Sequence, residues 1–289
     1  MALSTIQETL VLGLILSIMS FGVFISFRIL NIPDLTVDGS FTTGCAVSAI
    51  CTVQGHPLLG ILLACIAGAC AGLVTGFLQT KGKVQPLMAG ILTMTALYSI
   101  NLKILGDMPN ISLFGKATLF SIVNPSQNTV YNISLALGIV ILLMFLLYLF
   151  LKTQLGMSIR ATGDNEDMVR ASSIHADRMK RIGMAISNGL VAMGGAIYAQ
   201  NQGFVDVSGG IGMMVVGLAG IIVGEAFIRN KAMLGRFIAV VFGAILYRFM
   251  LTIALQLGIE ASNLNLFSAC LVAIAISLPN LKKRRSKHA

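Results

Sequence analysis

The chain has 289 residues, of which 56% are hydrophobic and 11% are charged, and its mean hydropathy is +0.88. An ordinary soluble domain is about half apolar and about one-quarter charged, so this composition excludes a soluble protein. The formal net charge of +9 does not indicate nucleic-acid binding, because the basic residues lie between apolar runs and at the C-terminal end instead of along one soluble face.

Apolar runs of roughly 17 to 25 residues recur along the whole chain, and each can cross a ~30 Å hydrocarbon layer only as a helix. The sequence therefore predicts an all-α polytopic membrane protein, with residues 1–289 as one transmembrane domain. The runs predict about nine spans, of which the second is short for a full crossing. They are Thr9–Leu30, Gly39–Val53, Leu58–Leu78, Pro86–Leu105, Ile133–Leu151, Ile182–Tyr198, Ile211–Ile228, Phe237–Leu255 and Leu264–Leu278.

The first run is preceded by Glu8 and by neither a basic region nor a cleavage site of small residues. This pattern predicts a retained span and not a removed signal peptide. The five cysteines, which lie within apolar runs, are expected to act as small hydrophobic residues.

Two carboxylates follow the first span, where Asp34 comes after Pro33 and Asp38 comes before Gly39. A carboxylate in or near the bilayer costs on the order of 3 kcal/mol, so it normally faces a polar cavity or a cation. One interpretation is a broken helix whose side chains line a translocation path. The other is an interfacial loop in which Asp38 caps the next helix.

The only long polar passage, residues 152–181, is basic but mixed in sign. Asp164 or Asn165 is a candidate N-cap, Glu166 and Asp167 would occupy a first helical turn, and Met168, Val169 and Ala171 would form an apolar strip. These features predict a short helix that inserts into a groove of another protein. The alternative is an amphipathic helix that lies against its own bundle. A second short helical piece is expected at Ala176–Arg181.

The distribution of Lys and Arg predicts the orientation. Positive charge concentrates at Lys81 and Lys83, in the long polar passage, around Arg229–Arg236 and in the tail after Leu281. The alternate connections are free of Lys and Arg except for Lys116 in the loop Gly106–Asn132, which also carries Asp107. With nine spans, the polar passage and the C-terminus would lie in the cytoplasm and the N-terminus outside.

A weak internal repeat accompanies this topology. The segment Asn31–Gly39 is followed by a short helix rich in small residues, a turn and a long helix, and the segment Gln202–Gly210 precedes the same series. The two copies would start on opposite sides of the membrane, which predicts an inverted repeat with broken or short helices. A chance likeness between two Gly/Asp turns is the alternative.

No enzyme site is indicated. His56, His175 and His288 are far apart and fall in different compartments, so they predict neither a metal site nor a proton relay. No P-loop pattern is present. Intramembrane carboxylates suited to an ion relay are scarce, which favours a partner as the energy source. For Arg28 and Arg248, snorkelling or a structural ion pair is favoured over contact with a substrate, and Glu225 is similarly ambiguous.

The run GMSIRATGDNEDMVRASSIHADRMKRIGMAISNGLVAMGGAIYA resembles the cytoplasmic coupling segment and following helix of permease subunits of bacterial ABC importers of the branched-chain amino acid and ribose type. The earlier segment NIPDLTVDGSFTTGCAVSAI is similar to the first-half pattern of that family, and RILNIPDLTVDGSF resembles a subfamily labelled tryptophan or tyrosine transport permeases. The resemblance covers Leu10–Leu278.

This resemblance implies a multi-pass protein of the bacterial cytoplasmic membrane that acts as a homodimer, with cytoplasmic ATPase subunits, an extracytoplasmic substrate-binding lipoprotein and no cofactor of its own. The lack of an extra first helix argues mildly against a sugar as substrate and leaves an amino acid, with an aromatic one as a candidate. The competing hypothesis is a secondary transporter or channel that works without an ATPase. Residues near the pathway would be Asp34, Thr36, Asp38 and Gly39. The coupling helix would comprise Gly163, Asp164, Asn165, Glu166, Asp167, Met168, Val169, Arg170 and Ala171.

Overall fold

A computed structural model describes residues 3–124, 129–228, 232–260, 263, 266–270 and 273. Almost all of its regular structure is helical, which confirms the predicted all-α class. Among the described residues, six helices are long and apolar enough to cross a membrane. They are α1 with its π-helical last turn η1 (Leu3–Phe24 and Ile25–Ile29), α3 (Pro57–Thr80), α4 (Pro86–Ile104), α6 (Thr129–Lys152), α9 (Ala176–Gln202) and α11 (Met233–Gln256).

Two further apolar helices are shorter, namely α2 (Thr36–Val53) and α10 (Met213–Phe227). Each of the first eight predicted spans therefore overlaps a helix, and the ninth, Leu264–Leu278, falls largely outside the described residues. Several helices begin a few residues before the predicted spans, and α9 begins at Ala176 and continues without a break to Gln202. The separate helical piece expected at Ala176–Arg181 is the first turn and a half of this long helix.

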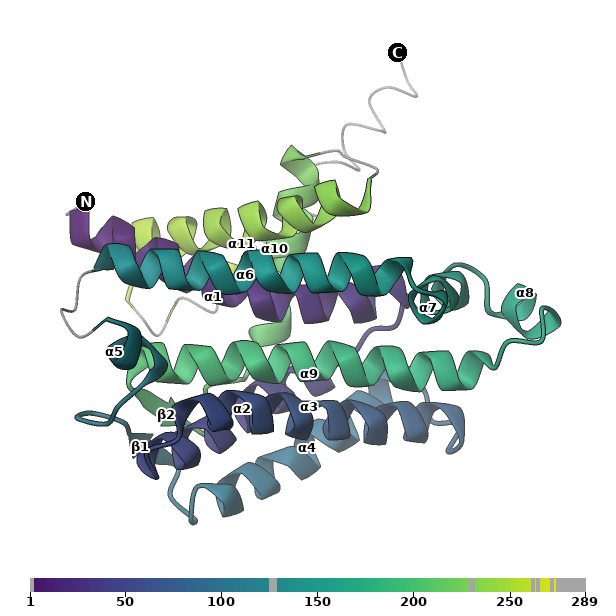
Figure 1. The fold of residues 1–289 in the computed structure, drawn as a ribbon, viewed down its shortest axis with the longest axis horizontal. Helices are drawn as coiled ribbons and strands as arrows, with labels where there is room; N and C mark the ends of the chain where they lie inside the picture. The colour runs from purple at the N-terminus through teal and green to yellow at the C-terminus, as the bar shows by residue number, and fades with distance from the viewer. Residues whose placement is uncertain are drawn as a thin grey trace.

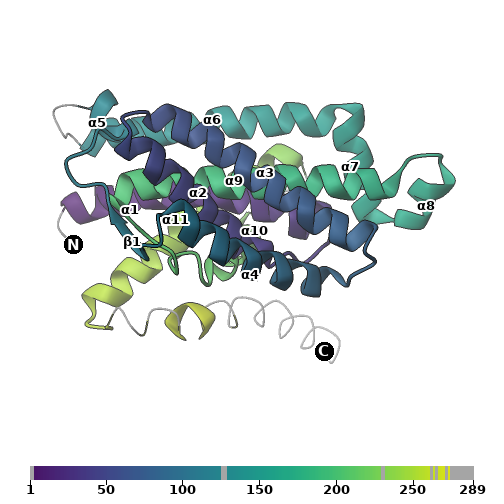
Figure 2. The same ribbon diagram turned by 90° about the horizontal axis from the view of Figure 1, so that it is seen from below.

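The two ends of the bundle differ in structure (Figures 1 and 2). One end carries the start of α1, the short helix α5 (Leu119–Val123) and a two-stranded ribbon of β1 (Asn110–Ser112) and β2 (Phe204–Asp206). The strands are antiparallel, with Ile111 opposite Val205. The opposite end carries α7 (Gln154–Asp164) and α8 (Glu166–Ala171). The N-terminus and the polar passage thus lie at opposite ends, as an odd number of intervening crossings requires.

Helices α1 and α9 form the centre of the bundle, since 83% and 72% of their apolar windows are buried, against 17 to 39% for α3, α4, α6 and α11. The outer helices expose rows of Leu, Ile and Phe, as expected for surfaces that face lipid or another chain. Small residues allow the close approach at the centre. A Cβ atom added to Gly44 of α2 would lie 1.9 Å from the carbonyl oxygen of Ala192 in α9.

Two three-helix segments, called here the first and the second half, pack on each other's first helix. Each half consists of a long, a short and a long helix, α1–α2–α3 and α9–α10–α11, and α1 and α9 start at opposite ends of the bundle (Figure 1). Helices α2 and α3 of the first half pack on α9, whereas α10 and α11 of the second half pack on α1. This reciprocal arrangement agrees with the predicted inverted repeat.

Candidate functional site

The first candidate site is the junction where the two short helices begin. Asp38, in the first turn of α2, accepts hydrogen bonds from the backbone N–H groups of Gly212 (2.9 Å) and Met214 (2.7 Å) at the start of α10. Gly212 has a positive φ of 86°, a conformation that favours glycine. Asp38 therefore caps a helix, as one interpretation of the sequence proposed, but the helix is α10 of the other half and not α2 itself.

Asp34 supports the start of α2 from the preceding loop. Its side chain is buried and accepts hydrogen bonds from the backbone N–H of Thr36 (2.9 Å) and from Nδ2 of Asn188 in α9 (2.7 Å). Ser40 donates to Oδ1 of the same Asn188 at 2.7 Å. The start of α2 and the loop before it are thus joined to the central helix α9 by hydrogen bonds between buried side chains.

A row of hydroxyl groups extends this network toward the outer helices. Thr36 of α2 lies 2.8 Å from the hydroxyl of Thr75 in α3, and Thr75 donates to Thr93 in α4 at 3.0 Å. Gly39 is buried against Leu97 of α4, where a Cβ atom would meet the Leu97 side chain at 2.9 Å. The hydroxyls of Thr36, Thr75 and Thr93 thus meet their need for hydrogen-bond partners from one another in the apolar interior.

The four predicted pathway residues therefore lie close together, but within a single chain their contacts hold α2 to the neighbouring helices. Their exposed fractions are 1% for Asp34, 0% for Thr36 and 9% for Asp38. Sequence reasoning missed their partners Ser40, Thr75, Thr93 and Asn188, for which the available signal was a polar side chain inside an apolar run. Contact of any of these residues with a transported solute stays a prediction.

The second candidate site is the α7–α8 segment. Thr153 caps α7 by accepting from the N–H of Gly156 (3.2 Å), and Asn165 caps α8 by accepting from the N–H of Met168 (3.0 Å). The cap of α8 is thus one of the two residues that the sequence offered. Gly163 lies against the end of η1, where a Cβ atom would come within 1.8 Å of the Ile29 carbonyl oxygen. Close backbone contact at this glycine holds the segment to α1.

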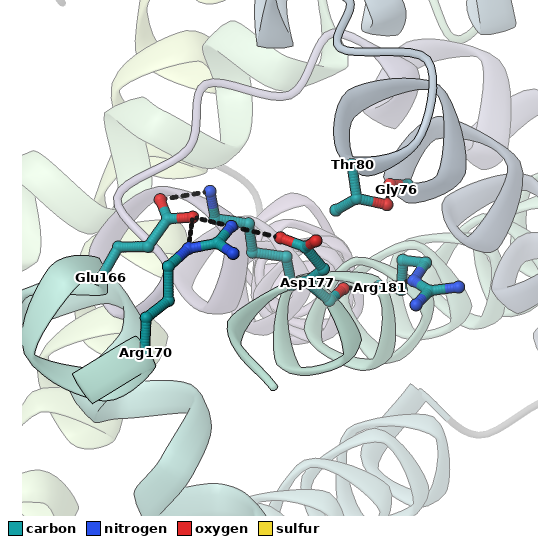
Figure 3. A network of polar contacts seen from close by, with 7 residues as sticks. Gly76, Thr80, Glu166, Arg170, Asp177 and Arg181 are labelled. Atoms are coloured by element: carbon teal, nitrogen blue, oxygen red, sulfur yellow. Dashed lines mark hydrogen bonds and ion pairs between the residues drawn. The ribbon is translucent and has the colours of Figure 1, made fainter. Parts of the chain in front are cut away.

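Ion pairs join α8 to the start of α9 (Figure 3). Glu166 contacts Arg170 (2.8 Å) and Lys180 (2.5 Å), and Arg170 also contacts Asp177 (2.5 Å). The hydrogen bond from Lys180, followed by that from Arg170, lowers the pKa of the Glu166 carboxyl below its usual value. Glu166 therefore remains ionised at neutral pH and bridges the two helices.

The two faces of α8 have different surroundings. Val169 is buried, with 1% of its surface exposed, whereas the preceding residue, Met168, is 54% exposed. Asp167 is also exposed and forms no ion pair among the described residues. The predicted apolar strip is thus divided, since Val169 packs on its own chain while Asp167 and Met168 are free to meet another molecule.

The remaining charged candidates are also placed. Arg28, at the end of η1, forms an ion pair with Glu225 of α10, which is one of the two alternatives favoured for this arginine. His56 precedes α3 at the ribbon end and His175 precedes α9 at the α8 end, while His288 lies outside the described residues. Within the described part of the chain, no three His, Cys, Asp or Glu side chains are grouped to hold a metal ion.

Known proteins are similar to this chain over almost its whole length. Residues 5–276 match the family described as "Branched-chain amino acid transport system / permease component". A tyrosine transport system permease protein of Clostridioides difficile is 39% identical over 280 residues, which cover 96% of this chain and 92% of that protein. The ribose import permease of Escherichia coli K12 is 24% identical over 97% of this chain and 84% of its own length.

A solved structure, PsaBC from Streptococcus pneumoniae in complex with Fab, shares the fold with a TM-score of 0.56. The match covers 93% of this chain and 90% of that chain at 15% identity.

Proposed function

Because this chain belongs to the family of permease components of branched-chain amino acid transport systems, we propose that it is the membrane subunit of an ATP-driven ABC importer. In this proposal residues 1–289 form one permease domain, and residues 152–181 are its cytoplasmic coupling loop. Separate cytoplasmic ATPase subunits supply the energy, a second copy of the chain completes the pathway, and an extracytoplasmic lipoprotein delivers the solute. The C-terminus lies in the cytoplasm, as the positive charges predict.

The division of α8 into two faces carries this proposal. A short helix that projects at the end of the bundle, with one apolar face held by its own chain and an exposed Met168, suits insertion into a groove of a partner. Among the nine proposed coupling residues, Asp167 and Met168 are assigned to docking. Glu166 and Arg170 are assigned to positioning, because their charges are already engaged with α9.

A contiguous route leads from α8 into the membrane. The ion pairs of Glu166 with Lys180 and of Arg170 with Asp177 fasten α8 to α9. Helix α9 is the central helix on which α1, α2 and α3 pack. A displacement of α8 by a nucleotide-driven partner would therefore tilt α9 and with it the α2 junction at Asp34 and Asp38, which supports the exchange of inward and outward access.

Co-purification with the ATPase subunit tests this assignment. We expect the double variant Asp167→Lys, Met168→Ala to retain less than about one-tenth of the bound ATPase while it folds normally, because it changes only exposed side chains. Lys116→Glu, a charge change in the loop at the opposite end of the bundle, is the matched control and should bind ATPase normally. Solute uptake by vesicles that contain the wild-type chain and no ATPase would refute the importer and favour a stand-alone transporter.

The solute class follows from the relatives. One relative at 39% identity is named for tyrosine transport and one at 24% for ribose import, so we propose an amino acid, with aromatic amino acids as the first candidates. The chain contains no Trp and is only 7% aromatic, so the partner lipoprotein would make most of the selection. Uptake of labelled tyrosine by the reconstituted complex, with ribose as competitor, tests this. Inhibition by ribose but not by leucine or phenylalanine would contradict it.

A further inference from the structure

One positive charge, that of Arg248, lies inside an apolar span and has no counter charge among the described residues. Arg248 is the sixteenth residue of α11, its side chain is half-buried, and its Nε is buried without a hydrogen-bond partner. All eleven Asp and Glu residues of the sequence lie in the described part of the chain. No described carboxylate forms an ion pair with Arg248.

Arg28, which lies near the end of the first span, differs from Arg248 in having a counter charge. Arg28 meets Glu225 of α10, so its charge is compensated within the chain. An uncompensated guanidinium in apolar surroundings is costly, and intramembrane charges therefore normally face a partner or a polar cavity. The contrast between the two arginines suggests that the partner of Arg248 comes from outside the chain.

Helical spacing places Arg248 on the face of α11 that packs against α1. Ile245 lies against Gly13, where a Cβ atom would be 2.9 Å from the Ile245 Cα. Two turns beyond Ile245, the hydroxyl of Thr252 lies 3.1 Å from that of Thr9, which is one turn before Gly13 in α1. Residues 245, 248 and 252 have the spacing of one helical face, so Arg248 extends from the α1 side of the helix and not from its lipid side.

The position of Arg248 along α11 and the direction of its Cα–Cβ bond also disfavour simple snorkelling. Arg248 lies eight residues before the end of α11 at Gln256, which is about 12 Å along the axis. Side chains of a helix tilt toward its N-terminus. Because α11 runs antiparallel to α1, as the Thr9–Thr252 and Gly13–Ile245 contacts require, its N-terminus lies at the far end of the bundle. The Cα–Cβ bond of Arg248 is thereby directed away from the nearer end of the helix.

We propose that Arg248 is an oxyanion-binding residue, which holds a carboxylate or phosphate group beside the α1–α11 contact. The planar guanidinium donates two parallel hydrogen bonds to such groups, and a buried, unpartnered Nε–H is one of the donors that this geometry uses. The group could come from a carboxylate-bearing solute or from the headgroup of an anionic phospholipid.

Thermal unfolding of the purified full chain in neutral detergent tests the proposal with two pairs of probes. Phosphatidylglycerol is compared with diacylglycerol, which lacks the phosphate, and L-tyrosine with tyramine, which lacks the carboxylate. We expect one oxyanion probe to raise the unfolding midpoint of the wild-type chain by about 3 °C or more, and its matched neutral probe to leave it unchanged.

Variants assign the effect to Arg248. Arg248→Met removes the charge and should abolish the rise, whereas Arg248→Lys, which lacks the fork of donors, should reduce it. Arg236→Gln removes one positive charge from an exposed position of the same helix and should keep the full rise. If Arg248→Met does not fold, Arg248→Gln replaces it.

The probes separate the two sources. A rise with phosphatidylglycerol alone assigns a lipid headgroup, and a rise with tyrosine alone assigns a solute carboxylate. The proposal is overturned if neither probe shifts the wild-type midpoint, or if the shift persists in Arg248→Met. The assay contains no ATPase, so either result is independent of the importer proposal.

Discussion

Asp38 joins the two halves of the chain, and its removal should have a large and calculable effect. Its carboxylate accepts two backbone hydrogen bonds, from Gly212 and Met214, across 174 and 176 residues of sequence. A hydrogen bond to a charged group contributes about 1.5 to 3 kcal/mol, and a buried donor left without a partner adds its own cost. We therefore expect Asp38→Ala to lower the free energy of unfolding by about 3 to 5 kcal/mol.

Asp38→Asn should cost less, about 1 to 2 kcal/mol. The amide keeps one acceptor oxygen but turns an NH2 group toward a backbone N–H, so one of the two bonds to α10 is lost. At roughly 2 °C per kcal/mol for a chain of this size, the unfolding midpoint should fall by roughly 6 to 10 °C for Asp38→Ala and by roughly 2 to 4 °C for Asp38→Asn. Thermal unfolding in detergent, followed by far-ultraviolet circular dichroism, measures both.

Asp206 provides the matched control, because it also accepts a backbone N–H, from Ser208 at 2.7 Å, but this hydrogen bond is exposed at the end of β2. Asp206→Asn should cost under about 1 kcal/mol, since water can replace the lost contact. If Asp38→Asn is as stable as the wild-type chain, or if the two Asn variants are equally destabilised, a structural role for Asp38 at the α2–α10 junction is excluded.

Two other predictions concern packing and charge. Gly44→Ala should destabilise the chain by about 3 kcal/mol or more, because the added Cβ would lie 1.9 Å from the Ala192 carbonyl oxygen. Gly138→Ala of α6, where no neighbouring atom lies within 4 Å of the added Cβ, should be neutral or slightly stabilising. Equal unfolding midpoints of the two variants would contradict the α2–α9 contact. Since the pKa of Glu166 is lowered, its ion pairs should be complete above the unfolded-state value of about 4.3 and should be lost as pH falls through the lower folded-state value. Hydrogen exchange of the α8 amides should therefore be unchanged from pH 7 to 5 and accelerate only below about pH 4, after correction for intrinsic rates, and acceleration near pH 6 would contradict the assignment.

The sequence predicted most of the helices, because a long apolar run is decided by the transfer of one segment from water to lipid and needs no knowledge of its neighbours. It also predicted α8, since an Asx cap and acidic first turn are local signals. It did not predict the ribbon of β1 and β2, whose strands are three residues each and nearly a hundred residues apart. So short a pair is formed only when the folded bundle brings its strands together.

What the sequence alone determined, then, is the class of the protein, the approximate positions of the helices at the first eight predicted spans and the family to which it belongs. Only the tertiary structure decided that α1 and α9 are central, that Asp38 caps α10 and that, among the described residues, Arg28 has a counter charge while Arg248 has none. The physical reason is the solvent. In lipid the inner and outer faces of a helix are both apolar, so hydrophobic periodicity cannot identify the partner of each face. That choice depends on close approach at small residues such as Gly44 and on polar contacts between distant segments, which exist only once the helices are assembled.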